Sequence, residues 1–235
     1  MATKSGNATA LTVLSPIKNG TVDETSYADI TRERCLRLPI HENSPLSKVP
    51  NTYLARLFIL DDVFYESLPA NDAVFNFSDI TSLFSDSARK KALPRKDHLK
   101  SKYLVFSSNF YGNLEDYLAG MWEKWSYVDH EGNQRDIRHI WEHCVAFDRV
   151  TDSASFISYI KRCQLDASLF FNGSTDDSLQ EQLKALYLKQ EFTQFAVAHQ
   201  GKNAAEIQQA FKAFIERVQP QNLESPTWAP GKSTP

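Results

Sequence analysis

Two short apolar runs constrain the fold of this chain more than any other feature. In residues 53–60 the alternating side chains are apolar on both sides, with Arg56 as the exception, and residues 102–107 include Tyr103-Leu104-Val105-Phe106. Runs of this length and composition predict β-strands. Because successive side chains of a strand point to opposite faces, we expect a sheet that must be shielded from water on both faces.

The elements around these strands follow a ferredoxin-like order. An apolar run at 11–14 precedes them, a weakly helical pattern covers 23–38, and a helix that Asn113 can cap follows the second strand. With Val145-Ala146-Phe147 as a fourth strand, the order is β-α-β-insert-β-α-β. This order predicts the α+β class, with a ferredoxin-like antiparallel sheet and covering helices. Two helices cover one face of such a sheet, so we expect the other face to be bare or buried by a second sheet.

Composition shifts predict one domain with two disordered ends. We expect a lead-in at 1–9, a single α+β domain at 10–218, and a proline-containing tail at 219–235. A long insert at 61–100 separates strands 2 and 3, and connections of this length usually have structure or function of their own. Its first part is apolar and predicts core packing or a lid, whereas its last part is cationic and indicates a solvated loop.

The C-terminal third predicts three more helices. Asp152 or Ser153 can cap the first, and apolar stripes predict two extra helices, one from about Leu179 and one over 204–218. Between the first of these helices and the other two, residues 167–171 are strand-like and end at an Asn-Gly turn pair.

Charge and composition exclude several classes of function. The formal net charge of −3 gives no general attraction to nucleic acid or to an anionic membrane. No apolar run approaches the roughly 20 residues that span a bilayer. Cys35, Cys144 and Cys163 are widely spaced and odd in number, which indicates a reducing compartment. We therefore expect a cytoplasmic protein that binds neither nucleic acid nor membrane.

The densest group of chemically versatile side chains lies between Asp136 and Cys144. His139 and His143 are four residues apart, so on a helix both rings lie on one face and could share a metal or a haem. A zinc site needs a third ligand, which the sequence does not identify, so we assign no metal site. In the plainer interpretation, one histidine faces solvent and the other is hydrogen-bonded at the helix end.

Three further residues have a structural and a functional interpretation. Cys144 is better read as a buried structural thiol than as a nucleophile, because free cysteines are usually interior. Trp141 is a core residue or a cofactor contact, and its indole N–H needs a partner. Arg56 either faces water and pairs with a carboxylate, or contacts the anionic group of a ligand.

Four blocks of sequence carry a resemblance: Leu11-Thr12-Val13-Leu14-Ser15-Pro16-Ile17-Lys18, Ser44-Pro45-Leu46 with Val49-Pro50-Asn51-Thr52-Tyr53-Leu54-Ala55-Arg56, Leu104-Val105-Phe106-Ser107-Ser108-Asn109-Phe110-Tyr111-Gly112, and Ile140-Trp141-Glu142-His143-Cys144. Together they resemble an uncharacterised bacterial family related to the dimeric α+β barrel superfamily. That superfamily includes dye-decolorising peroxidases, chlorite dismutases and small cofactor-free monooxygenases. Tyr53 stands where a His is usual and Tyr111 where an Asp is usual, and the Gly-rich haem-peroxidase motif is missing. These differences argue against peroxidase activity in particular.

Two functional hypotheses follow. In the first, the chain is a homodimeric α+β-barrel protein that binds a small, largely apolar or aromatic ligand, or haem, with oxidative chemistry implied by the resemblance. Arg56 and His143 are its candidate catalytic residues, and His139, His143 and Trp141 its candidate cofactor contacts. In the second, the chain is a non-enzymatic dimeric interaction protein that recruits a partner through its C-terminal helices or tail.

Overall fold

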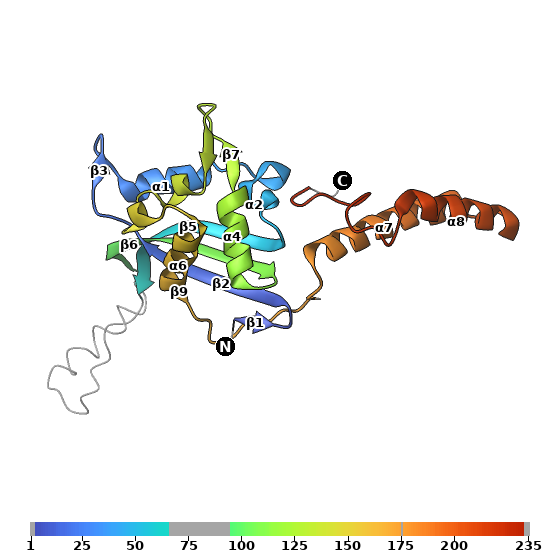
Figure 1. Ribbon diagram of the computed structural model, residues 1–235, viewed down its shortest axis with the longest axis horizontal. Coiled ribbons are helices and arrows are strands. Elements are labelled where there is room, and N and C mark those ends of the chain that lie inside the picture. Colours follow the sequence, from blue (N-terminus) through green and yellow to red (C-terminus); the bar gives the residue numbers. More distant parts are fainter. Residues whose placement is uncertain (1–2, 66–94, 175, 233–235) are drawn as a thin grey trace, which may run out of the picture.

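The structure is a mixed α+β arrangement built on an antiparallel sheet (Figure 1). This computed structural model describes residues 3–65, 95–174 and 176–232. The sheet runs β5–β6–β2, and β1 and β9 both pair with the outer edge of β2. The strands are β1 (Lys4–Ser5), β2 (Ala8–Pro16), β5 (Thr52–Tyr65), β6 (Arg95–Tyr111) and β9 (Gln164–Leu165).

Strands β5 and β6 form a long hairpin. The strands predicted at 53–60 and 102–107 lie inside them, so those two predictions are confirmed. Both strands extend further, to Tyr65 and Arg95, because backbone pairing continues through polar residues where the apolar alternation stops. Most of the insert, 66–94, lies outside the described residues, together with most of its apolar part and the start of its cationic run.

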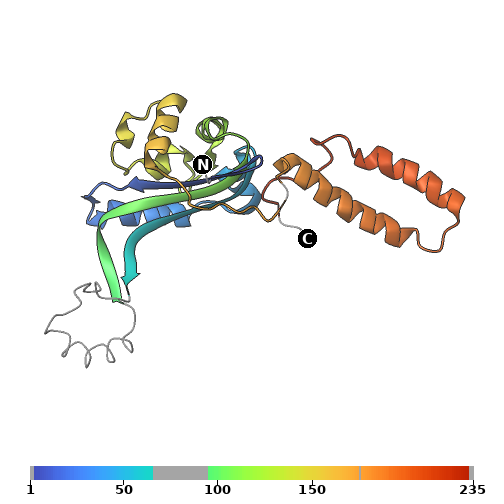
Figure 2. The same cartoon turned by 90° about the horizontal axis from the view of Figure 1, so that it is seen from below.

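Helices cover one face of the sheet, and Figure 2 shows α4 and α6 on the same side of it. The Asn113 side chain accepts a hydrogen bond from the Asp116 N–H at the start of α4, and Asp152 does the same for Ser155 at the start of α6, so both predicted caps are confirmed. The helices of this layer are α1 (Tyr27–Leu36), α2 (Pro45–Lys48), α4 (Leu114–Lys124), α5 (Arg138–Trp141) and α6 (Ser153–Cys163).

The core lies between this helical layer and the sheet. Each fully buried large apolar side chain contributes about 1.5–3 kcal/mol relative to an exposed one. Phe106 of β6 meets Trp141 of α5 edge to face with ring centroids 5.8 Å apart, which fixes α5 against the sheet. The largest fully buried apolar side chains are those of Trp125, Trp141, Phe106, Phe110, Phe156, Leu11, Leu104, Leu118, Met121, Ile137 and Ile140.

The fourth strand lies elsewhere than predicted. Ala146 has a φ of 62°, in the left-handed region, so Val145-Ala146-Phe147 cannot continue as a strand, and a 3₁₀ turn begins at Phe147. Cys144 makes only a single antiparallel bridge to Ile17. The extra strand is β9, whose Leu165 pairs with Thr12 of β2. The strand-like run at 167–171 has no regular secondary structure.

The other face of the sheet carries no helix in the part of the chain that is described. Ala55 and Leu57 of β5 pack against the core, whereas Leu54 and Phe58 point the opposite way and are 49% and 47% exposed. We call this surface the bare face. It consists of Leu54, Arg56, Phe58 and Leu60 of β5, Tyr103, Val105, Ser107 and Asn109 of β6, Ala10, Thr12 and Leu14 of β2, and Leu165 at its β9 edge.

Two short hairpins and two 3₁₀ turns complete the body. The hairpins pair β3 (Thr21–Val22) with β4 (Thr25–Ser26) and β7 (Ser126–Val128) with β8 (Gln134–Asp136). The turns are η1 (His41–Asn43) and η2 (Phe147–Arg149).

The C-terminal helices α7 (Leu179–Ala198) and α8 (Ala204–Val218) form a hairpin that projects from the body (Figures 1 and 2). The buried Lys184 ammonium donates hydrogen bonds to the carbonyls of Val218 and Pro226, at 2.7 and 2.8 Å. This cation stabilises the carbonyl end of α8 and holds part of the segment that we expected to be a disordered tail. Similarly, β1 lies within the expected lead-in. No described helix is long and apolar enough to cross a membrane.

Candidate functional site

The segment from Asp136 to Cys144 folds as the short helix α5 and the turn after it. Arg34 of α1 holds this segment from outside, because its guanidinium donates hydrogen bonds of 2.7 Å to the His139 carbonyl and to the Glu142 carboxylate. The helix ends at Trp141. His143 therefore lies beyond it, and the helical spacing that would align the two histidines is not maintained.

His139 pairs with a tyrosine. Its Nδ1 lies 2.6 Å from the hydroxyl oxygen of Tyr127, and which atom donates depends on the imidazole tautomer. Burial, with the nearby Arg34 and Arg135 guanidinium groups, lowers the pKa of His139 to about 4. Burial raises the pKa of Tyr127 to about 12, so both groups are neutral at pH 7. His139 also lines an open hollow of about 460 Å³ with Gln134, Arg135, Asp136, Arg138, Glu142, Phe147, Asp148 and Val150.

His143 occupies a different environment. Its ring stacks on Tyr27 of α1, with centroids 4.4 Å apart and planes 14° apart. Its Nε2 is buried and has no hydrogen-bond partner among the described residues. Burial and Arg34 lower the pKa of His143. Since Tyr27 packs against the core, His143 lies on the helix-covered side of the sheet.

His139 and His143 do not form a shared ligand pair for haem or a metal, because their rings lie in different environments. The Nε2 of His143 is enclosed by protein, so an iron could reach it only by displacing its neighbours. The Nδ1 of His139 is engaged by Tyr127, which leaves Nε2 as the nitrogen through which His139 could hold a ligand. Among the described residues, no group of three or more His, Cys, Asp or Glu side chains could hold a metal ion.

Trp141 and Cys144 are core residues. Trp141 is fully buried, and its indole N–H donates to the Ser15 hydroxyl at 3.1 Å, which supplies the partner that the sequence required. Cys144 is fully buried, and burial raises the pKa of its thiol to about 12. A thiol with so high a pKa contains almost no thiolate at neutral pH, so Cys144 is a poor nucleophile.

Arg56 and His143 do not share a site. Arg56 lies on the bare face opposite Ser107 of β6, and it is exposed, whereas His143 is on the helical side. The two candidate catalytic residues therefore lie on opposite faces of the sheet. Among the described residues no carboxylate forms an ion pair with Arg56, although Asp61, one of the acids near it in sequence, pairs with Arg32.

The sequence indicated apolar neighbours for Arg56 but did not include them among the candidate site residues. Leu54 and Phe58 lie two positions on either side of Arg56, so the period-two pattern already placed them on the same face. Leu165 joins this surface only through its pairing with Thr12, which no local pattern indicates.

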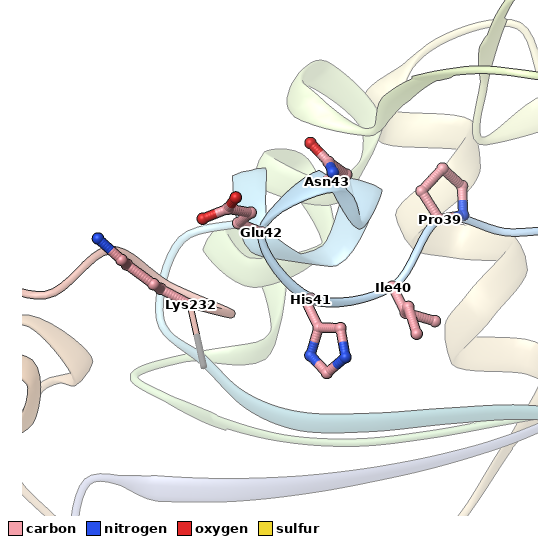
Figure 3. A pocket seen from close by; sticks show the side chains of 6 residues that line it. All are labelled: Pro39, Ile40, His41, Glu42, Asn43 and Lys232. Atoms are coloured by element: carbon pink, nitrogen blue, oxygen red, sulfur yellow. The ribbon is translucent and has the colours of Figure 1, made fainter. Parts of the chain in front are cut away.

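A second open hollow, of about 570 Å³, lies between η1 and the C-terminal tail (Figure 3). Figure 3 shows Ile40 and His41 pointing to one side of this loop and Glu42 and Lys232 lying at its other side. It contains none of the residues that the sequence singled out, and we assign it no function.

No family model, curated protein or solved structure matches this chain.

The partly buried His139 makes stability depend on pH. In the folded state His139 titrates near pH 4, and in the unfolded state near 6.5, so between these values the unfolded chain binds more protons. Stability therefore falls as the pH drops through this window. Because one pKa unit equals about 1.4 kcal/mol and the ring is partly solvated, we expect a loss of about 1–2 kcal/mol from His139. Urea unfolding at pH 7 and pH 4.5 measures this loss. His139→Gln is expected to show a clearly shallower pH dependence, and an unchanged slope would contradict the assignment.

Proposed function

We propose that this chain forms a homodimer through its bare face and binds a small, largely apolar ligand with an anionic group there, contacted by Arg56. The observation that carries this proposal is a sheet face on which apolar side chains surround one exposed guanidinium. In addition to Leu54 and Phe58, Leu165 is 50% exposed at its edge. Contiguous apolar patches on soluble proteins usually mark binding surfaces.

We also propose that the fold is ferredoxin-like, as in the dimeric α+β barrel superfamily that the sequence resembles. The strand order β9–β2–β6–β5 with antiparallel neighbours supports this assignment. The order of the elements along the chain supports it as well, because α1 comes between β2 and β5, and α4 and α6 come between β6 and β9. Pairing of two sheets would shield the bare face from water and would enclose the Arg56 side chain of each copy.

The charge of Arg56 defines the ligand chemistry. A guanidinium that leaves water in a dimer interior must meet an anion, because burying an unpaired charge is strongly unfavourable. The described part of the bare face places no carboxylate, histidine or thiol beside Arg56. We therefore propose binding rather than turnover at this face, and a ligand that supplies a carboxylate, sulfonate or phosphate next to an aromatic or aliphatic body.

The probe 8-anilinonaphthalene-1-sulfonate has this chemistry, and its fluorescence rises in apolar sites. We expect saturable binding to the wild-type protein, and a dissociation constant about tenfold or more higher for Arg56→Gln, the range of one charge-assisted hydrogen bond. Arg149→Gln, at an exposed position of η2, is the matched control and should bind as the wild type does. Equal affinity for wild type and Arg56→Gln would refute the role of Arg56.

A second candidate function is partner recruitment by the hairpin of α7 and α8. This hairpin projects from the body (Figure 1) and carries half-exposed apolar side chains, which are Leu186, Phe192, Val197, Ile207, Phe211 and Ile215. If it recruits a partner, Leu186→Ser with Phe192→Ser abolishes capture of that partner in a pull-down, and Arg56→Gln leaves capture intact. The opposite pattern would favour the bare face as the recruiting surface.

We propose a cytoplasmic location, supported by three free cysteines. The small net negative charge supports a protein without a nucleic-acid or membrane partner.

A further inference from the structure

The segment between β9 and α7 carries the two most exposed large apolar side chains among the described residues. Leu169 and Phe171 are 83% and 82% exposed, although the sequence of 167–171 is typical of a strand. We call residues 166–173 the strap. Together with the nearby apolar side chains of the bare face, these two side chains form an exposed apolar patch, and such patches mark interaction surfaces.

Both ends of the strap are fixed to the sheet. At its start, Leu165 pairs with Thr12 on the outer edge of β2. Just beyond its end, the carboxylate of Asp176 accepts a 2.7 Å hydrogen bond from the Asn7 backbone N–H, and the Asp177 carbonyl accepts one of 2.7 Å from the Tyr53 hydroxyl. The strap therefore runs from the outer edge of β2, past β1, toward the end of the sheet where β5 begins (Figure 1).

We infer that the strap packs against the bare face of a second copy, with Leu169 and Phe171 as its apolar contacts. This inference rests on the proposed dimer and adds a surface outside the sheet to its interface. The strap would form the rim of that interface, since it lies at the border of the face that the second sheet covers.

The exposed area supports a second copy as the occupant. With about 200 Å² for a whole large apolar side chain, Leu54, Phe58, Leu165, Leu169 and Phe171 together expose roughly 600 Å². A stable dimer buries about 800 Å² per partner. The side chains on the sheet alone provide about half of the exposed area in this set, so the strap brings the surface close to what a dimer needs.

The charges of the two surfaces are complementary. The strap begins at Asp166, and Asp176 and Asp177 follow its end, whereas the charged group of the bare face is the guanidinium of Arg56. In a dimer the acidic ends of one strap would lie at the rim of the other copy's bare face, and the ligand would still supply the anion beside Arg56. Because both ends of the strap are already held, docking would order few additional residues, which favours binding.

Sedimentation equilibrium of the full chain tests this inference. Leu169→Ser with Phe171→Ser is expected to raise the dimer dissociation constant by about 30-fold or more, the effect of losing interface anchors. Because both side chains are exposed in the protomer, the variant should keep the wild-type fold, as circular dichroism would show. The matched control is Leu36→Ser with Ile40→Ser, two apolar side chains that are 79% and 71% exposed away from the bare face. It should dimerise as the wild type does.

The other outcomes are distinguishable. If the strap variant dimerises like the wild type while Leu54→Glu with Phe58→Glu dissociates, the strap is not part of the interface and the sheet-to-sheet dimer stands. An equal loss of dimer in the control would also overturn the inference, because it would show a general effect of removing surface apolar groups. A wild-type chain that is monomeric throughout would remove both the strap contact and the proposed dimer.

Discussion

Replacing Leu54 and Phe58 together by glutamate is expected to convert the protein to a monomer. In the proposed dimer these side chains lie on facing sheets, so the substitutions would bury four carboxylates with only the two Arg56 guanidinium groups near them. We expect the dimer dissociation constant to rise at least about 100-fold, as measured by sedimentation velocity over a concentration series. The fold should persist, because both side chains point away from the core.

The matched control for this double variant is Leu36→Glu with Ile40→Glu. It adds the same charge at exposed apolar positions outside the bare face and should leave the dissociation constant within about threefold of the wild-type value. Monomerisation by both variants would point to net charge as the cause. Unchanged dimerisation by the Leu54 and Phe58 variant would show that the bare face is not the interface.

Substituting Trp141 by alanine is expected to lower the free energy of unfolding by about 3–5 kcal/mol. The indole ring packs edge to face against Phe106, Trp125 and Phe156, and its centroid lies 6.3 Å from that of Trp125 and 6.2 Å from that of Phe156. Its removal therefore leaves a large cavity. It also removes the N–H that donates to the Ser15 hydroxyl, which is itself buried. Guanidinium unfolding followed by circular dichroism measures the change.

Trp122→Ala is the control for this prediction. The ring centroids of Trp122 and Phe156 are 5.5 Å apart, but Trp122 is only partly buried on α4. We therefore expect its replacement to lower the free energy of unfolding by about 1–2 kcal/mol. Similar losses for both tryptophans would contradict the placement of Trp141 at the centre of the core. A near-normal stability of Trp141→Ala would do the same.

Local signals predicted the parts of the fold that depend on neighbouring residues. Contacts within a few positions specify the strand at 53–60 and the helix starts at Asn113 and Asp152. All three predictions are confirmed. The fourth strand failed for the opposite reason. Ala146 adopts a left-handed backbone that its residue type does not indicate, and β9 pairs through Leu165 and Gln164 alone with a strand about 150 positions away.

The candidate site shows the same division. Arg56 was recognisable because one charge interrupts an apolar strand, and its exposure on one face follows from strand alternation. The shared face of His139 and His143 depended on a helix that continues past Trp141, but α5 ends there. In the structure His139 instead contacts Tyr127 and His143 contacts Tyr27. Both tyrosines belong to other elements, so no local sequence pattern predicts these contacts.

The solution mass of the full wild-type chain is the most direct measurement of whether a second copy covers the bare face. Light scattering coupled to size-exclusion chromatography at about 10–100 μM should give twice the chain mass of 26.7 kDa, for a dissociation constant in the low micromolar range or below. A mass of 26.7 kDa across that whole range would contradict the proposed dimer, and with it the enclosed environment that we propose for Arg56.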